Sequence, residues 1–415
     1  MHAALIWLIA ALTIALMLLR PRGISESVWT SGGAILLIVS GLISVPLAGK
    51  AIARGFNVYL FLTGMMLLAE LGKRYGVFDW LAALAVRGAK GSPRRLFTLV
   101  FAVAVIVTAF LSNDATAVVL TPAVLAAVRR ARANPLPYLF ICALIANAAG
   151  FLLPISNPAN LVVFNHIMPP LVDWLAMFLL PAIVAITVTY FLLRSIFRHD
   201  LSGECNGHVT HPPLSHTGRM VLYGMCAVAA LMLVASGLHW NLGLPACLAA
   251  SILAVFALVH RDESPTLLLR GISWTVLPLV ASLFIIVAAT EQAGALNILR
   301  HAVQTASAWN PASGALAVGA VTAFGTNIVN NLPLGLIAGS TLRAAPVHLL
   351  MQKAVLIGID LGPNLSVAGS LATLLWLMAL RREGIEISAG RFLKAGLILM
   401  PPTLLLTLLA ALLTR

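Results

Sequence analysis

The chain has 415 residues, of which 60% are hydrophobic and only 9% are charged. A soluble domain carries about a quarter charged residues, so the composition excludes an ordinary water-soluble protein and indicates one that a bilayer surrounds. The formal net charge of +13 comes mostly from Lys and Arg in short loops between apolar segments. That pattern is typical of membrane orientation by positive cytoplasmic loops, and it argues against nucleic-acid binding.

Apolar segments long enough to cross ~30 Å of hydrocarbon recur along the whole chain. The first of them has no basic leader and no small-residue cleavage site, so we interpret it as a retained span and not a signal peptide. The sequence therefore predicts an all-α polytopic membrane protein with roughly 10–12 membrane-spanning segments. The apolar segments lie at about 3–19, 28–48, 55–72, 136–153, 174–193, 220–236, 242–260, 272–290, 346–361, 366–380 and 393–413.

One long polar stretch, residues 198–219, interrupts this pattern and is rich in Pro, Gly and His. We predict that it is a cytoplasmic linker between an N-terminal half, residues 1–197, and a C-terminal half, residues 220–415. A metal cluster is the alternative, but the ligand spacing is irregular, so the linker is favoured and no metal site is predicted. The histidines concerned are His199, His208, His211 and His216.

The segment 96–128 does not fit a simple span. Positive charges flank it closely on both sides, so the positive-inside rule places both of its ends in the cytoplasm. Two full crossings need about 40 residues and a turn, so the 33 residues of this segment predict a re-entrant hairpin. Its expected tip is the polar triplet Ser112, Asn113 and Asp114. The flanking charges are Arg87, Lys90, Arg94, Arg95, Arg129, Arg130 and Arg132.

The segment 311–342 is the counterpart of this hairpin in the C-terminal half, with Thr326 and Asn327 near its middle. Only Arg300 and Arg343 flank it, which fits entry from the opposite side of the membrane. Residues 75–79 resemble 293–297, residues 112–113 resemble 326–327, and residues 158–160 resemble 363–364. We therefore predict two inverted-topology repeats, each with a re-entrant hairpin and a broken helix, which is an arrangement that marks a transporter with a midplane binding site.

Two acids, Asp114 and Asp360, stand inside the apolar segments. A carboxylate at that depth costs ~2.5–3.5 kcal/mol on insertion scales, so we favour a functional role over a simple helix cap, although one residue can do both. A carboxyl group away from water holds its proton more readily than one in water, which suits proton exchange. The hypothesis is a proton-coupled carrier in which Asp114, Asp360 or both exchange a proton for the solute. Glu70 and Glu291 lie near span ends and are interpreted as interfacial.

Asparagine and hydroxyl side chains gather at the predicted helix breaks. For any single Asn, the alternative role is to satisfy backbone groups that a break leaves free. As a cluster they predict a neutral hydrogen-bonding cage, and because no Lys or Arg falls among these motifs, the cage suits a neutral polar molecule or a small cation. No nucleotide or metalloprotease motif is present, so we predict neither an enzyme nor a cofactor. The predicted substrate-binding residues are Asn113, Thr116, Asn157, Asn160, Asn327, Asn331 and Asn364.

Three motifs carry a resemblance to known families. The sequence SNDATA at 112–117, followed by LTP at 120–122, resembles the hairpin tip of the ion transporter superfamily, and so does TN at 326–327 with NNLP at 330–333. The stretch GIDLGP at 358–363, continuing as GSLATLLW at 369–376, is similar to a signature of the arsenical pump membrane protein family, the arsenite/antimonite efflux carriers. The resemblance extends from the N-terminus to about residue 392.

This resemblance implies export of arsenite and antimonite in exchange for protons, by alternating access, across the bacterial cytoplasmic (inner) membrane. It also implies a soluble arsenite-stimulated ATPase as a candidate partner on the cytoplasmic face. In sodium-coupled relatives, the tip asparagines help to bind sodium; those relatives usually have Thr where this chain has Asp114, which favours a proton here. Arsenous acid is largely neutral and suits an amide cage. The alternatives are a sodium-coupled or sodium/proton carrier of the superfamily, and a membrane subunit that works only with the ATPase.

Overall fold

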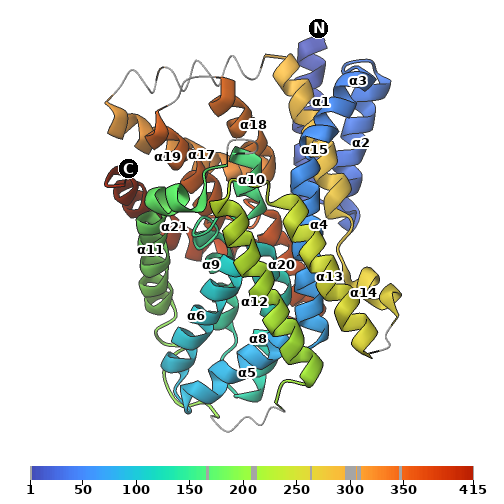
Figure 1. The fold of residues 1–415 in the computed structure, drawn as a ribbon. Helices are drawn as coiled ribbons and strands as arrows, with labels where there is room; N and C mark the ends of the chain where they lie inside the picture. Colours follow the sequence, from blue (N-terminus) through green and yellow to red (C-terminus); the bar gives the residue numbers. More distant parts are fainter. Residues whose placement is uncertain are drawn as a thin grey trace.

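The computed structural model describes residues 2–164, 168–206, 213–261, 264–294, 305, 310–344 and 348–414. Within these ranges every regular element is helical (Figure 1). Seven of the described helices are long and apolar enough to cross a membrane, or up to nine spans if each bent pair counts as one. The prediction of an all-α polytopic membrane protein is confirmed. Several other apolar segments are broken into shorter helices.

Hairpin 1, residues 93–130, is a re-entrant hairpin as predicted. Its first arm is α6 (Pro93–Phe110), which begins after Ser92, whose Oγ accepts a hydrogen bond from the Arg95 amide at 3.4 Å. The chain reverses at Leu111 and Ser112 and returns through α7 (Asn113–Ala115), the π-helix η2 (Thr116–Leu120) and α8 (Thr121–Arg130). Both arms therefore have their outer ends at the same end of the molecule, in the lower part of Figure 1.

Hairpin 2, residues 311–344, consists of α17 (Pro311–Val329) and α18 (Asn331–Ala344) in the upper part of Figure 1. The reversal occurs at Asn330, which has φ 75°, a conformation that Asn tolerates better than most residues. The predicted tip at Thr326 and Asn327 is therefore one turn too early, since both residues lie inside α17. The position equivalent to Asn113 is Asn331, because both begin the second arm of their hairpin.

Each half also contains a helix that is broken beside a hairpin tip. In the N-terminal half, α9 (Leu136–Ala148) and α10 (Pro158–Phe164) flank the break. In the C-terminal half, α19 (Leu349–Leu361) and the short η4 (Gly362–Asn364) precede it, and α20 (Leu371–Arg382) follows. The predicted match of residues 158–160 with 363–364 is thus out of register. The helix after the N-terminal break, α10, begins at Pro158, whereas the helix after the C-terminal break, α20, begins at Leu371. The other predicted match pairs residues 75–79 with 293–297, and of these, residues 295–297 lie outside the described residues.

The tips dock on the breaks in the same way in both halves. The amide N–H of Asn113 donates to the carbonyl of Ser156 at 2.9 Å, and the amide N–H of Asn331 donates to the carbonyl of Gly369 at 2.9 Å. The two broken helices meet where Asn147 Nδ2 donates to Asn364 Oδ1 at 2.9 Å. The same backbone hydrogen bond between a hairpin tip and a break thus occurs in both repeats.

The remaining helices surround this core. Helix α13 packs against α4, α15 packs against α2 and α3, and α11 packs against α21. Their bounds are α1 His2–Leu19, η1 Pro21–Gly23, α2 Glu26–Val39, α3 Val45–Arg54, α4 Phe56–Arg74, α5 Val77–Ala89, α11 Leu171–Ile196, α12 His216–Gly237, α13 Gly243–Arg261, α14 Pro265–Gly271, α15 Val276–Gln292 and α21 Ala389–Leu412.

The predicted linker 198–219 overlaps α12, which begins at His216. Its described N-terminal part lies against the ends of hairpin 1, where the Cys205 amide donates to the Gly91 carbonyl at 2.9 Å. His208, His211 and Arg300 lie outside the described residues, as does the side chain of Arg343. Among the described residues, no group of three or more His, Cys, Asp or Glu side chains could hold a metal ion.

Close packing of α21 against the C-terminal break leads to a stability prediction. A Cβ atom at Gly396 would overlap the carbonyl oxygens of Leu365 and Asn364. We expect Gly396→Ala to lower the thermal unfolding temperature in detergent, since overpacking of this kind costs about 1–3 kcal/mol. Gly390→Ala on the same helix is the matched control, because a Cβ there has open space. Equal unfolding temperatures for the two variants would contradict the packing described here.

Candidate functional site

A small cavity lies between the two hairpin tips, and we call it the tip cavity. Asn113 and Asp114 reach it from hairpin 1, Asn331 reaches it from hairpin 2, and Asn157 reaches it from the N-terminal break. Residues separated by more than 200 positions in the chain thus surround one space, as the repeat hypothesis predicts. The other lining residues are Leu62, Pro158, Val276, Leu332, Leu371 and Ala372.

The tip asparagines present free acceptors. Asn113 and Asn331 are each 3% exposed, and the Oδ1 atom of each is buried without a hydrogen-bond partner. Buried polar atoms are nearly always hydrogen-bonded, so two equivalent exceptions at one cavity call for an explanation. An unpartnered amide oxygen can accept a hydrogen bond from a hydroxyl group or bind a small cation.

Asp360 lies behind the tip cavity and is connected to it through Asn157. Asn157 Nδ2 donates to Asp360 Oδ1 at 2.5 Å, while Asn157 Oδ1 accepts from the Ala159 amide at 3.0 Å and so caps α10. Asp360 is fully buried, and its Oδ2 atom has no hydrogen-bond partner. One carboxyl group, Asp114, therefore faces the cavity, and the other stands one amide away from it.

The other four predicted site residues point into the protein. Thr116 Oγ1 lies 2.8 Å from Thr108 Oγ1 between the arms of hairpin 1. Asn160 Nδ2 donates to three backbone carbonyls of the N-terminal break, the shortest contact being 2.9 Å to Gly150. Asn327 and Asn364 likewise donate to backbone carbonyls, at 3.0 Å to Gly362 and 3.0 Å to Leu144. The three asparagines thus satisfy backbone carbonyl groups that the breaks and the crossing of the helices leave without a partner.

A second space, the entry cavity, adjoins the tip cavity and shares Leu62, Asp114, Pro158 and Val276 with it. It is lined by Ser112 and Asp114 at one end and by Glu70, Lys73 and Arg382 at the other. The second end belongs to the same end of the molecule as the basic residues that flank hairpin 1. The positive-inside rule assigns that end to the cytoplasm.

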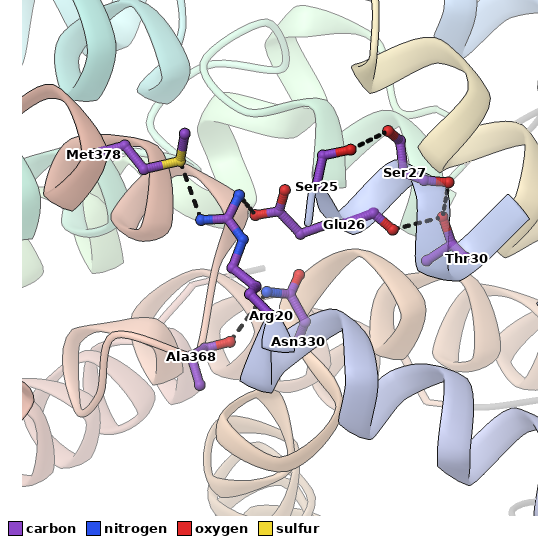
Figure 2. A network of polar contacts seen from close by, with 8 residues as sticks. All are labelled: Arg20, Ser25, Glu26, Ser27, Thr30, Asn330, Ala368 and Met378. Atoms are coloured by element: carbon purple, nitrogen blue, oxygen red, sulfur yellow. Dashed lines mark hydrogen bonds and ion pairs between the residues drawn. The ribbon is translucent and has the colours of Figure 1, made fainter. Parts of the chain in front are cut away.

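Beside the entry cavity, a polar network joins the α1–α2 connection to α20 (Figure 2). Arg20 forms an ion pair with Glu26 and donates to Met378 Sδ at 3.0 Å. In the same view, Asn330 Nδ2 donates to the Ala368 carbonyl at 3.0 Å and holds hairpin 2 on its break. Sequence reasoning missed the Arg20–Glu26 pair, and it left Asn147 out of the site although a Pro-containing break follows that residue.

The opposed hairpins, the broken helices and the polar cavity between them define this chain as a membrane transporter. The family model of the citrate transporters (CitMHS) matches residues 5–380. The chain belongs to this transporter family.

Similar proteins agree with this assignment. The chain is 26% identical over 417 residues to an arsenical pump membrane protein of Escherichia coli, covering 97% of this chain and 96% of that protein. It is 27% identical over 359 residues to an uncharacterized transporter of Mycobacterium tuberculosis, covering 82% of each chain. Among solved structures, the YdaH transporter of Alcanivorax borkumensis is similar with a TM-score of 0.56 at 16% identity, covering 99% of this chain and 97% of that one. This last likeness concerns the fold alone.

Proposed function

We propose that this protein is a secondary carrier that exports arsenite and antimonite, as neutral trivalent hydroxides, in exchange for protons across the bacterial cytoplasmic membrane. The observation that carries the proposal is the lining of the tip cavity, which includes the Asp114 carboxyl and three Asn side chains and, in the part of the chain that the structure describes, no Lys or Arg. A free citrate anion would meet a carboxylate there and no side-chain cation to balance its charge. The similarity to arsenical pump membrane proteins supports the same substrate class.

Asp114 is the proposed exchange group. When it is ionised, it accepts a hydrogen bond from one hydroxyl of the solute, while Asn113 Oδ1 and Asn331 Oδ1 accept from the others. Protonation of Asp114 from outside turns the carboxylate into a neutral carboxyl group, which is a weaker acceptor, and so favours release of the solute to the outside. Release of the proton to the cytoplasm restores the carboxylate. Solute and proton thus compete for one carboxyl group, which couples their opposite movements.

Asp360 is the second proposed proton carrier. It has no direct contact with the tip cavity, so it would act through Asn157, whose amide lies between the cavity and Asp360 Oδ1. The remaining predicted site residues, Thr116, Asn160, Asn327 and Asn364, would act indirectly by fixing the breaks and the hairpins that carry the cavity-lining groups.

A sodium-coupled carrier is the second candidate. The unpartnered Oδ1 atoms of Asn113 and Asn331 are hard oxygen donors of the kind that alkali and alkaline-earth cations take. Asp114 in the same cavity would balance the charge of such a cation. The distinction between the two candidates rests on which ion drives transport.

The test is arsenite uptake into proteoliposomes of the purified protein, with an imposed pH gradient and without sodium or ATP. We expect uptake that a protonophore abolishes. A requirement for sodium would replace the proposal with the sodium-coupled candidate. Uptake only after a soluble arsenite-stimulated ATPase and ATP are added would make the chain the membrane subunit of a pump, and uptake of citrate instead of arsenite would refute the substrate assignment.

A further inference from the structure

Glu70, interpreted from the sequence as interfacial, lies in the wall of the entry cavity. Helix α4 lines this cavity along one face, from Leu62 beside the hairpin tips to Glu70 and Lys73 near the cytoplasmic end. The charged residues that line the entry cavity are Glu70, Lys73, Asp114 and Arg382. Among the described residues that line this space, Glu70 is therefore the only carboxyl group other than Asp114.

The carboxyl group of Glu70 is held in place by two contacts. Glu70 Oε2 lies 3.4 Å from Lys73 Nζ, and the Glu70 side chain is 13% exposed. Oε1 packs against Gly271, where a Cβ atom would overlap the carboxyl group. Gly271, Ile272 and Ser273 form the wall of the cavity at the junction of α14 and α15. The absence of a side chain at Gly271 thus leaves the room that Glu70 occupies.

Glu70 and Asp114 line the same cavity, and among the described residues no hydrogen bond joins them. A proton that moves between the two carboxyl groups would therefore pass through water in the cavity. The entry cavity has a volume of about 130 Å³, which is enough for several water molecules, and Ser112, Asp114, Glu70, Lys73, Ser273 and Arg382 supply polar groups along its otherwise apolar wall.

We propose that Glu70 is the cytoplasmic proton-relay residue of this carrier, an inference that rests on the proposed proton coupling. Asp114 gives its proton to water in the entry cavity, the Glu70 carboxylate takes up a proton from that water, and Glu70 then releases it to the cytoplasm. No bond other than these O–H bonds forms or breaks. Lys73 and Arg382 line the same cavity as Glu70, while the neighbouring Arg270 on α14 is exposed.

The first test compares net transport with solute exchange for Glu70→Gln in proteoliposomes. Net arsenite uptake driven by a pH gradient requires Asp114 to lose its proton, whereas exchange of labelled for unlabelled arsenite at equal pH does not. We expect net uptake to fall about tenfold or more, as for loss of a proton-transfer group, with exchange and KM unchanged and with recovery in Glu70→Asp. Equal loss of both activities would overturn the relay, and so would no loss of either.

Lys73→Met separates the relay from the ion pair. If Glu70 only holds α4 through its contact with Lys73, Lys73→Met should reproduce the Glu70→Gln result, and the relay would be refuted. If Glu70 relays protons, Lys73→Met keeps net uptake. Gly271→Ala, which displaces the Glu70 carboxyl group, should resemble Glu70→Gln. Glu383→Gln, at an exposed acid of the same end of the molecule, is the matched control with wild-type behaviour.

A second measurement decides the inference even if arsenite is not the solute. The carboxyl C=O stretch of protonated Asp114, assigned by its loss in Asp114→Asn, can be followed by infrared spectroscopy after a pH jump. We expect the band to change about tenfold more slowly in Glu70→Gln than in the wild type. An unchanged rate would refute the relay. Absence of arsenite uptake by the wild type would refute the proposed function separately.

Discussion

Asp114→Asn should abolish arsenite uptake driven by a pH gradient, with a loss of about 100-fold or more. The substitution keeps the size of the side chain, and an amide can still form hydrogen bonds in the tip cavity. It cannot, however, lose and regain a proton, so a pH gradient has no group to act upon at the site. The measurement is the initial rate of labelled arsenite uptake into proteoliposomes with equal amounts of folded protein.

Asp79→Asn is the matched control for this prediction. Asp79 lies in the first turn of α5 and is exposed, so the same chemical change there removes a carboxylate without touching either cavity. We expect wild-type uptake from that variant. If Asp114→Asn retained wild-type uptake, Asp114 would not be the exchange group, and Asp360→Asn would become the variant to examine.

Asn364→Leu should destabilise the whole protein more than any other substitution considered for the site. Asn364 accepts from Asn147 Nδ2 at 2.9 Å and donates to the Leu144 carbonyl at 3.0 Å, in a fully buried position where the two halves cross. Leucine would leave both groups without their partner, at a cost of about 1–3 kcal/mol for each. Thermal unfolding in detergent should show a clear decrease in the unfolding temperature.

The double variant Asn147→Leu/Asn364→Leu tests the contact itself. Removing both amides takes away the unsatisfied Asn147 donor, so the double variant should lose less stability than the sum of the two single changes. Asn241→Leu, in the exposed connection between α12 and α13, controls for the exchange of Asn for Leu. Additive losses, or no loss in Asn364→Leu, would show that the crossing contact contributes little.

Composition and charge alone determined the class of this protein. A chain with 9% charged residues has too few polar groups to face water, so its helices must face lipid. The sequence also predicted hairpin 1, because seven positive charges flank a segment that is too short to cross the membrane twice. The clustering of Asn and Asp at helix breaks predicted a site there, since polar groups at membrane depth are costly unless function requires them.

Tertiary structure decided what each of these polar side chains does. Asn113 and Asn160 are the same residue type in the same kind of segment, yet Asn113 lines the tip cavity and Asn160 donates to the backbone carbonyls of a break. The tip of hairpin 2 lies at Asn330, not Asn327, because the turn depends on a left-handed backbone conformation and on docking against Gly369. Asn157 and Asp360 stand 203 positions apart and share a hydrogen bond. Such contacts depend on which distant segments pack against one another, and a local sequence pattern does not show this.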